Sequence, residues 1–401
     1  MSVSVILGDV HLGKGLSIGK PGIGAALNSR IVDQLNILEW TLDRAMEYMA
    51  RSIIITGDVF QDSKPHPTII ALFISWLKKC TDNDIDVHII AGNHDILRSG
   101  QFYMSALDII SAADIEGVYV YKYMSTLHTP GVSFTLIPFR DRRSFNTDSN
   151  AEAMQNIRAA VPYELASIEA HNAKVVVGHL CIEGSIPVGD EIDDLGNELF
   201  CPVEMFEGYD FTWMGHVHKP QILSKDPYVS HIGSMDLSDF GEADHTKVIV
   251  VFDPKKSEPY KYLEIPSRPL KQISVSVPAS NLSTTDYVLG ELKTKHKDLS
   301  KAIVSLSITL SSPDLVTVDR TQVESCLTGL GAFHISRISE EKKVSLIKKN
   351  SANEVIDSTV NEFTAIKMYA DVNVDTKIRN DFITLATAIA KECSSESKES
   401  K

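Results

Sequence analysis

Five short motifs carry side chains that bind metal ions, and each begins with a glycine directly after an apolar run. In chain order they are Gly8-Asp9-Val10-His11, Gly57-Asp58-Val59-Phe60, Gly92-Asn93-His94-Asp95, Gly178-His179 and Gly215-His216-Val217-His218. A glycine lets the chain leave a strand in a conformation that other residues resist. In Asp9-x-His11 and His216-x-His218, the spacing of two points both side chains of an extended segment the same way. The motifs predict ligands that converge on one site.

The chemistry of this ligand set favours two ions. Two aspartates, one asparagine and four histidines supply oxygen and nitrogen but no thiolate, which suits Mn, Fe or Zn and differs from cysteine-rich structural zinc sites. Seven ligands are too many for a single ion that keeps an open position. Two ions that share a bridging carboxylate can clamp the attacking and leaving oxygens of a displacement at phosphorus.

Each motif alone has a simpler explanation. Aspartates near turns are often turn or capping residues, and an isolated histidine is more often a surface or core residue than a ligand. The simpler explanation stands for seven histidines without such context: His88, His128, His171, His231, His245, His296 and His334. Five motifs in order at strand ends are a different matter, and they favour a metal site.

Alternating strands and helices must position these motifs. Apolar, β-branched runs predict strands at residues 3–7, 52–56, 87–91, 134–138, 174–177, 211–214 and 247–252. Apolar residues every three or four positions predict helices at 30–51, 67–80 and 151–172. Strands buried on both faces and alternating with helices favour an α/β sandwich. Ligands in such sheets bind beyond the carboxyl ends of the strands, where the motifs lie.

The character of the chain changes after the junction Ile265-Pro-Ser-Arg-Pro-Leu270. We expect a first α/β domain at 1–265 and a smaller α+β domain at 271–350, with strands at 271–277, 302–310 and 344–346. A helical segment follows at 351–392. There, one helical face carries Ile378, Phe382, Leu385 and Ile389. The Ser/Glu/Lys-rich tail at 393–401 is expected to be disordered.

Composition and charge limit the function classes. The 401 residues are 43% hydrophobic and 23% charged, as in a soluble globular protein. No run reaches the ~18 apolar residues needed to cross a bilayer, and five scattered cysteines without a CxxC favour a reducing compartment. Residues 271–401 hold 17 basic and 17 acidic residues, so residues 1–270 carry the whole net charge of −14. Such a region binds phosphate substrates poorly without metal ions or a partner.

The order GDxH, GDxx, GNHD, GH and GHxH resembles the calcineurin-like metallophosphoesterase superfamily. Within it, the chain looks most like the SbcD-type double-strand-break repair nucleases. The grounds are the GDVF and GNHD motifs, Ile232-Gly233-Ser234, Phe240-Gly241-Glu242 and the added C-terminal domain. The resemblance implies a four-layer αββα sandwich with a C-terminal capping domain. It also implies a bacterial or phage origin and a cytoplasmic location.

The resemblance implies a role for each matching residue. One ion would be held by Asp9, His11 and His218, the other by Asn93, His179 and His216, with Asp58 bridging them. Mn²⁺ is the expected metal. His94 would face the scissile phosphate and stabilise or protonate the leaving oxygen. Asp95 would orient His94, or else serve as a turn or cap residue. Some relatives have a histidine where this chain has Gln61, and His66 is the nearest substitute.

The implied activity is Mn²⁺-dependent exonuclease and endonuclease cleavage of DNA (double-stranded ends, single strands or hairpins) in repair and recombination. The implied partners are an SbcC-type coiled-coil ATPase and a second copy of the chain. The apolar face at 378–389 would contact the ATPase or pack internally. Loop arginines near the motifs could contact DNA phosphates: Arg98, Arg140, Arg142 and Arg143. The rivals are a phosphatase or small-molecule phosphodiesterase and a non-catalytic scaffold.

Overall fold

The fold was analysed in a computed structural model of the chain. It describes residues 3–24, 27–97, 104–188, 199–281, 283–312, 314–342, 366–367, 369–371, 374 and 378–399. Two compact units are distinguished. The first comprises Met1–Val275, Ser283–Ile308 and Thr317–Glu340, and the second comprises Ser276–Leu282, Thr309–Val316 and Glu341–Lys401. The metal-ligand motifs all lie in the first unit.

The first of two six-stranded sheets has the order β16-β15-β1-β2-β3-β6. Its strands are β1 (Val3–Leu7), β2 (Ala50–Ile55), β3 (Asp86–Ile90), β6 (Val118–Tyr121), β15 (Val248–Phe252) and β16 (Tyr260–Glu264). Strands β1, β2, β3 and β6 are parallel, whereas β15 runs antiparallel to β1 and to β16. The first three motifs therefore leave three neighbouring strands at the same edge.

The second sheet has the order β13-β14-β12-β9-β8-β7. Its strands are β7 (Ser125–Thr129), β8 (Val132–Ile137), β9 (Ala173–Gly178), β12 (Phe211–Met214), β13 (Gln221–Lys225) and β14 (Tyr228–His231). Strands β8, β9, β12 and β14 are parallel, and the outer strands β7 and β13 are antiparallel to their neighbours. The remaining two motifs follow the adjacent central strands β9 and β12.

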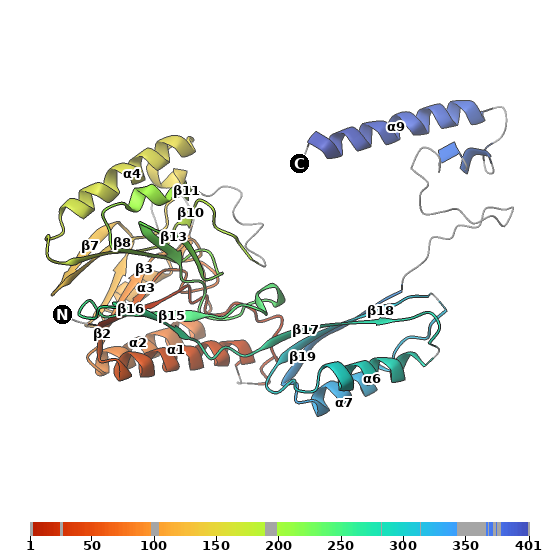
Figure 1. Cartoon of the computed structure of the whole chain (residues 1–401), viewed down its shortest axis with the longest axis horizontal. Coiled ribbons are helices and arrows are strands. Elements are labelled where there is room, and N and C mark those ends of the chain that lie inside the picture. Colours follow the sequence, from red (N-terminus) through yellow and green to blue (C-terminus); the bar gives the residue numbers. More distant parts are fainter. Residues whose placement is uncertain are drawn as a thin grey trace. The chain divides into compact units, whose positions relative to one another are not determined.

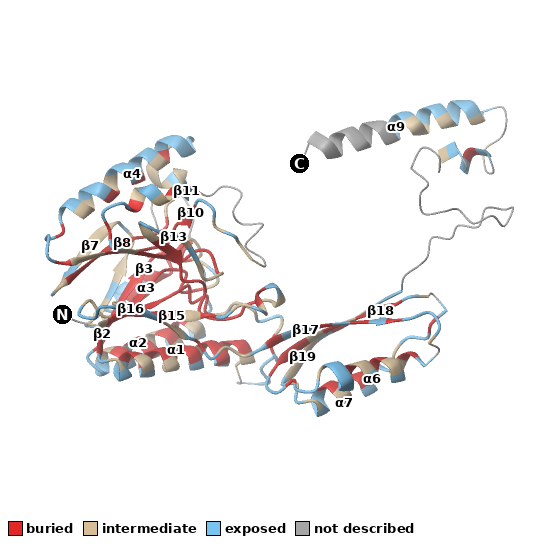
Figure 2. Cartoon of the chain, in the orientation of Figure 1, coloured by how far each residue is buried: buried red, intermediate tan, exposed pale blue. Residues whose placement is uncertain are grey.

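Helices cover the outer face of each sheet, so the four-layer αββα sandwich is confirmed (Figure 1). Helices α1 (Ser29–Glu47) and α2 (Pro67–Asp82) pack on the first sheet, and α4 (Asn150–Ala166) packs on the second. Apolar side chains from both sheets, including Ile54 and Trp213, form the core between them. Figure 2 shows this burial concentrated on the strands.

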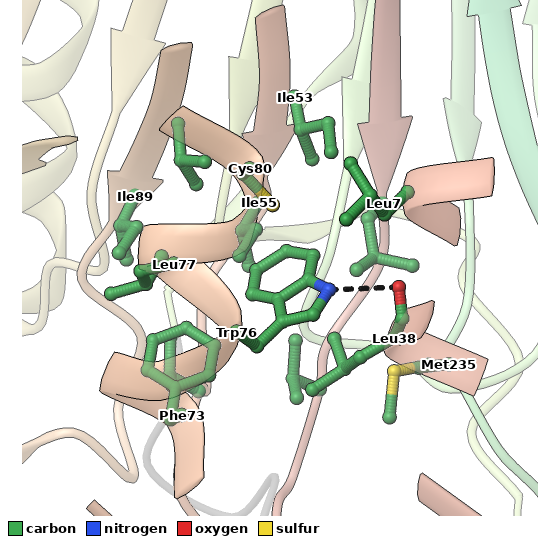
Figure 3. Close-up of a cluster of buried hydrophobic side chains, with 14 of the residues drawn as sticks. Leu7, Leu38, Ile53, Ile55, Phe73, Trp76, Leu77, Cys80, Ile89 and Met235 are labelled. Atoms are coloured by element: carbon green, nitrogen blue, oxygen red, sulfur yellow. Dashed lines mark hydrogen bonds between the residues drawn. The ribbon is translucent and has the colours of Figure 1, made fainter. Parts of the chain in front are cut away.

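The core beneath α1 and α2 fixes these helices on the first sheet (Figure 3). Trp76 is 2% exposed, and its indole N–H donates to the carbonyl oxygen of Leu38 over 2.9 Å. This bond satisfies the only polar atom of a side chain that otherwise contributes apolar area. Burial of one such side chain stabilises the fold by about 1.5–3 kcal/mol. The apolar residues whose spacing predicted α1 and α2 include those buried in this core, such as Leu38 and Trp76.

The helix ends differ from the predicted ends for local reasons. Helix α1 stops at Glu47 because Met49 adopts a left-handed φ of 53° and β2 begins at Ala50. Met49, counted with the apolar face of this helix, is instead 80% exposed. Helix α4 ends at Ala166, short of the predicted residue 172, with Ser167 as its C-cap.

Short elements complete the sandwich and were not predicted. They are β4 (Ile96–Leu97), β5 (Met104–Ser105), α3 (Leu107–Ala112), β10 (Cys181–Ile182), β11 (Phe200–Cys201) and the 3₁₀ helices η1 (Arg142–Phe145), η3 (Val203–Phe206) and η4 (Phe240–Glu242). Leu107 and Ile110 of α3 are buried in the core of the first sheet. This packing makes them part of the core beneath the first sheet.

Further strands and helices follow between residues 270 and 342, and these residues are divided between the two compact units. The strands form a three-stranded sheet of order β17-β18-β19, with β17 (Leu270–Val277), β18 (Ile303–Leu310) and β19 (His334–Lys342). Helices α6 (Thr284–Lys295) and α7 (Arg320–Gly329) lie side by side (Figure 1). The third strand predicted at 344–346 lies outside the described residues, whereas β19 was missed.

The last described helix is α9 (Arg379–Glu399). It continues through most of the tail that was expected to be disordered, and its Glu and Lys residues are compatible with helix because their intrinsic helix propensity is high. In this chain its apolar face is open: Ile378 is 58% exposed and Leu385 is 65% exposed. No helix among the described residues is long and apolar enough to cross a membrane.

Candidate metal centre

The structure brings all seven predicted ligands together at the carboxyl ends of five central strands. Asp9 and His11 follow β1, Asp58 follows β2 and Asn93 follows β3, while the other three, His179, His216 and His218, follow β9 and β12. The chain crosses between sheets here, since Asp9 N–H donates to the carbonyl oxygen of Gly233 and Met235 N–H donates to that of Asp9. The two sheets therefore contribute to one site.

Glycines and strained ligand backbones allow the loops to approach one another. A Cβ atom on Gly92 would lie 2.1 Å from Asp58 Oδ1. Gly57 has a φ of 132°, and a Cβ there would lie 2.3 Å from His179 Nδ1. His11 and Asp58 each adopt a φ of 45°. Such non-glycine conformations cost about 1–3 kcal/mol each and cluster at functional sites, which fits a site held in place by its surroundings.

The first ligand group consists of Asp9, His11 and His218. Their ligand atoms lie within 4.8 Å of one another, and all three side chains are buried. His11 Nε2 and His218 Nε2 are 2.9 Å apart, and Asp58 Oδ2 is 3.5 Å from His11 Nε2. Two imidazole nitrogens and carboxylate oxygens thus converge on the same small volume.

The second ligand group consists of Asn93, His179 and His216. Asn93 Oδ1 lies 2.9 Å from His179 Nε2 and 3.0 Å from His216 Nδ1. Asp58 Oδ2 is 3.3 Å from His179 Nε2. The same carboxylate oxygen therefore faces both groups. Asp58 is the residue for which the sequence analysis expected a bridging role, and that role stays a prediction.

The donor set fits divalent metal ions. It is composed of carboxylate, amide and imidazole groups, which suit Mn, Fe or Zn. Burial would raise the pKa of the Asp9 and Asp58 carboxyl groups, but the charges and hydrogen bonds of the surrounding histidines, chiefly His179, together outweigh burial and lower the pKa of both. Both carboxylates are therefore ionised in a water-poor site, where divalent cations would compensate them.

Metal binding is expected to strengthen as the pH rises. Burial would lower the pKa of His179, but Asp58 and Asp9 outweigh it and raise the pKa well above 6.5. In the ion-free protein this imidazole is then protonated at neutral pH, and an ion must displace its proton. Titration calorimetry in buffers of different ionisation enthalpy should detect about one proton released per protein near pH 7. Affinity and proton release that do not change between about pH 6 and pH 8 would contradict this expectation.

His94 lies at the edge of the centre. Its Nδ1 is 2.9 Å from the carbonyl oxygen of Gln61, which fixes this nitrogen as the donor. Its backbone N–H donates to Asp58 Oδ1 over 2.8 Å, and its ring centroid is 4.9 Å from that of His11. Potential ligand atoms of His94, His11 and Asp58 also lie within 4.8 Å of one another. The Gln61 backbone, not its side chain, therefore orients His94.

Asp95 does not orient His94, so that hypothesis is wrong. The Asp95 carboxylate is fully buried and accepts backbone N–H groups of Val59, Phe60 and Gly92 at 3.3, 3.2 and 3.0 Å. It thereby ties the loop that carries Asp58 to the loop that carries Asn93. The alternative considered for Asp95, a turn or cap residue, agrees better with these hydrogen bonds to backbone N–H groups.

Replacement of Asp95 by alanine is expected to reduce stability far more than an ordinary surface substitution does. Three buried N–H groups would lose their acceptor, and each such group costs about 1–3 kcal/mol when it is left unpaired. We expect a loss of about 3 kcal/mol or more in the free energy of unfolding, measured with urea in the presence of EDTA. Asp62→Ala, at an exposed position on the loop that carries Asp58, is the control. Equal midpoints for the two variants would refute this role.

The other predicted residues lie at varying distances from the ligand groups. His66 caps helix α2, with Nδ1 accepting from Thr68 N–H, and does not replace a histidine at position 61. Arg140 donates to the carbonyl oxygens of Phe139 and Lys122, and Arg142 and Arg143 lie in η1. The Phe139 ring contacts His179 and His216. Arg98 lies outside the described part of the chain.

Several supporting residues were not assigned from sequence. Thr56 donates its hydroxyl to Asp9 Oδ1 over 3.0 Å, and its carbonyl oxygen is 3.0 Å from His179 Nδ1. Gln34 of α1 bonds to the loop after Asp9, accepting from Gly13 N–H and donating to the carbonyl oxygens of His11 and Lys14. The only sequence signal for Thr56 is its position directly before the second motif. Gln34 carries no signal, because its role depends on the docking of α1.

Residues 4–220 match the calcineurin-like phosphoesterase family, which is more than half of the chain. The chain belongs to this family, as the order of its motifs implied, and a phosphoesterase is the class of protein that fold and site define.

Among curated proteins, the chain is similar to the SbcD subunit of the SbcCD nuclease of Escherichia coli K12, with 24% identity over 261 residues. That match covers 59% of this chain and 64% of the relative, so it spans less than two thirds of the relative's length. The corresponding protein of Staphylococcus epidermidis is 22% identical over 264 residues, covering 63% and 69%.

Solved structures are more distant. A dimetal phosphatase from Danio rerio aligns with a TM-score of 0.38 and 10% identity, covering 66% of this chain and 98% of that one. Nuclease MPE of Pseudomonas putida aligns with a TM-score of 0.27 and 15% identity, covering 62% and 84%. At these scores the alignments add nothing to the family assignment.

Proposed function

We propose that the chain is a two-metal-dependent DNA exonuclease and endonuclease, the nuclease component of an SbcCD-type repair and recombination complex. The observation that carries this proposal is the position of Asp58 Oδ2 between two ligand groups, 3.5 Å from His11 Nε2 and 3.3 Å from His179 Nε2. Two three-residue groups that share one carboxylate are suited to hydrolysis of phosphate esters.

The proposed metal roles follow the two groups. Asp9, His11 and His218 would hold one ion, Asn93, His179 and His216 would hold the other, and Asp58 would be a ligand of both. Mn²⁺ is the proposed metal because the resemblance to the SbcD-type nucleases implies it, and the oxygen and nitrogen ligands suit Mn as they suit Fe or Zn. When bound, a pair of divalent ions activates water and neutralises charge on a phosphodiester. The chain supplies buried carboxylates and fixed imidazoles, with Thr56 holding Asp9 and His179.

His94 is the proposed catalytic residue beside the ions. Because His94 Nδ1–H donates to the Gln61 carbonyl oxygen, Nε2 is the nitrogen left to face the substrate. In the imidazolium form, with a second proton on Nε2, His94 would donate that proton or a hydrogen bond to the leaving oxygen, as a general acid does. The arginines after β8 are proposed to contact DNA phosphates, and among them Arg143 in η1 is exposed.

The proposed partners rest on the names of the relatives and on helix α9. The relatives are each named as one component of the SbcCD nuclease. We infer an SbcC-type ATPase bound through the open apolar face of Ile378, Phe382, Leu385 and Ile389. A homodimer, a capping role for residues 271–350 and a cytoplasmic location belong to the same proposal.

Cleavage of linear duplex DNA labelled at one end tests the proposal. We expect nucleotide release with Mn²⁺ and none with EDTA. Bis-p-nitrophenyl phosphate should be hydrolysed faster than p-nitrophenyl phosphate, because the proposed substrate is a diester. The alternative is a phosphatase or small-molecule phosphodiesterase, which the shared ligand chemistry also supports. Intact DNA beside rapid hydrolysis of the monoester would favour it. A protein that binds no metal and cleaves none of these substrates would instead be a scaffold.

A further inference from the structure

A buried carboxylate outside the seven ligands contacts one of them directly. Glu242 lies in η4 and is fully buried, and its Oε1 is 3.0 Å from His218 Nδ1. Twenty-four residues separate the two in sequence. His218 Nε2, on the other side of the same ring, lies 2.9 Å from His11 Nε2 in the first ligand group. Glu242 therefore contacts the side of His218 that faces away from the metal centre.

Glu242 is itself fixed by three donors. Lys247 Nζ, also fully buried, is 3.3 Å from Oε2. Ser238 donates its backbone N–H to Oε2 over 2.8 Å and its hydroxyl to Oε1 over 3.1 Å. Lys247 further donates to the carbonyl oxygen of His218 over 2.9 Å. A carboxylate held in this way has one position and can impose one orientation on the imidazole.

The neighbours of His218 Nδ1 favour different tautomers. The Glu242 carboxylate at 3.0 Å accepts a proton from Nδ1, which leaves Nε2 bare for an ion. The Lys14 ammonium at 3.4 Å can only donate, which would place the imidazole proton on Nε2 and block the ligand position. The carboxylate is closer and ionised, so it decides the tautomer.

We propose that Glu242 is a positioning residue that holds His218 as the Nδ1–H tautomer and so sets metal affinity at the Asp9/His11/His218 group only. This inference rests on the two-metal site proposed above and not on the identity of the substrate. The described side-chain contacts of Glu242 are with His218, Ser238 and Lys247, so the second ligand group should be unaffected.

The packing of η4 supports a positioning role. Phe240 and Ala243, on either side of Glu242, pack with Leu237, Leu270 and Ile303. Leu270 begins β17 and Ile303 begins β18. Strands β17 and β18 thus help to hold in place the segment that carries Glu242. Their packing against this segment therefore also supports the orientation of His218.

Metal titration of the full chain tests the inference. Wild-type protein, stripped with chelator and titrated with Mn²⁺ in a calorimeter, should bind two ions. Glu242→Gln should bind one ion as tightly as wild type and the other about 10- to 100-fold more weakly. Asp236→Asn is the matched control, since Asp236 is buried and paired with Arg30 but contacts no ligand side chain in the described structure. It should bind both ions with wild-type affinity.

Two results would overturn the inference, and each differs from failure of the proposed function. If Glu242→Gln binds both ions with wild-type affinity, Glu242 does not position His218. The same conclusion holds if Glu242→Gln and Asp236→Asn each bind both ions more weakly and to the same extent. Wild-type protein that binds fewer than two ions would instead refute the two-metal proposal.

Should Glu242→Gln not fold, long-range ¹H–¹⁵N spectra of histidine-labelled wild type decide the matter. His218, assigned by its loss in His218→Asn, should carry its proton on Nδ1. A proton on Nε2 would refute the inference.

Discussion

The Asp58→Ala protein is expected to lose both high-affinity metal sites and its hydrolytic activity together. Asp58 Oδ2 faces His11 Nε2 and His179 Nε2, so its removal takes one ligand from each group at once. Asp58 Oδ1 also accepts the backbone N–H of His94, so the same change releases the proposed catalytic histidine. Loss of metal stabilisation worth several kcal/mol corresponds to a rate decrease of about 10³-fold or more.

The measurement pairs metal content with activity. Mass spectrometry after gel filtration should find about two Mn²⁺ per wild-type chain and well below one in Asp58→Ala. Asp62→Ala, an exposed aspartate on the same loop, should retain both ions and full cleavage. An Asp58→Ala protein that keeps two tightly bound ions would show that this carboxylate does not bridge the site.

The His94→Ala protein is expected to behave differently, keeping both ions while losing most cleavage. His94 belongs to neither three-residue ligand group, and its Nδ1 is bonded to the Gln61 carbonyl oxygen. Removal of a general acid lowers the rate by about 10²- to 10⁴-fold. The loss should be smaller for a substrate with a good leaving group, such as p-nitrophenolate, because that group needs no proton.

His66→Ala is the matched control for this variant. His66 caps helix α2, so its loss should cost about 0.5–2 kcal/mol of stability and leave cleavage by the folded protein unchanged. If His94→Ala loses one ion along with its activity, His94 is a ligand, as its cluster with His11 and Asp58 permits. If DNA and nitrophenyl substrates lose the same factor, His94 does not assist the leaving group.

The ligand positions were predictable because they follow from local patterns. A buried run ends, a glycine follows, and the next polar residue lies at the carboxyl edge of a parallel sheet. The sandwich was predictable for the same reason, since β-branched runs and helical spacing record burial residue by residue. The helix ends were less predictable, because Met49 carries an apolar side chain in a left-handed turn.

The supporting contacts were not predictable because they join distant segments. Asp95 accepts N–H groups from two loops more than thirty residues apart, and no spacing rule distinguishes it from an orienting aspartate. Glu242 was noticed within Phe240-Gly241-Glu242 but received no role. Its contact with His218 forms only in the folded chain, because the two residues are 24 positions apart in sequence. Strands β13 and β16 contain half-buried and exposed residues only. They lack the long apolar runs that mark the central strands, so the sequence pattern did not predict them.

The most direct test of the two-metal centre is an anomalous difference map from crystals grown with Mn²⁺. Two peaks are predicted, one among Asp9, His11 and His218 and one among Asn93, His179 and His216, both adjacent to Asp58 Oδ2. A single peak, or a second peak away from Asp58, would contradict the shared-carboxylate centre and with it the proposed mechanism of phosphodiester hydrolysis.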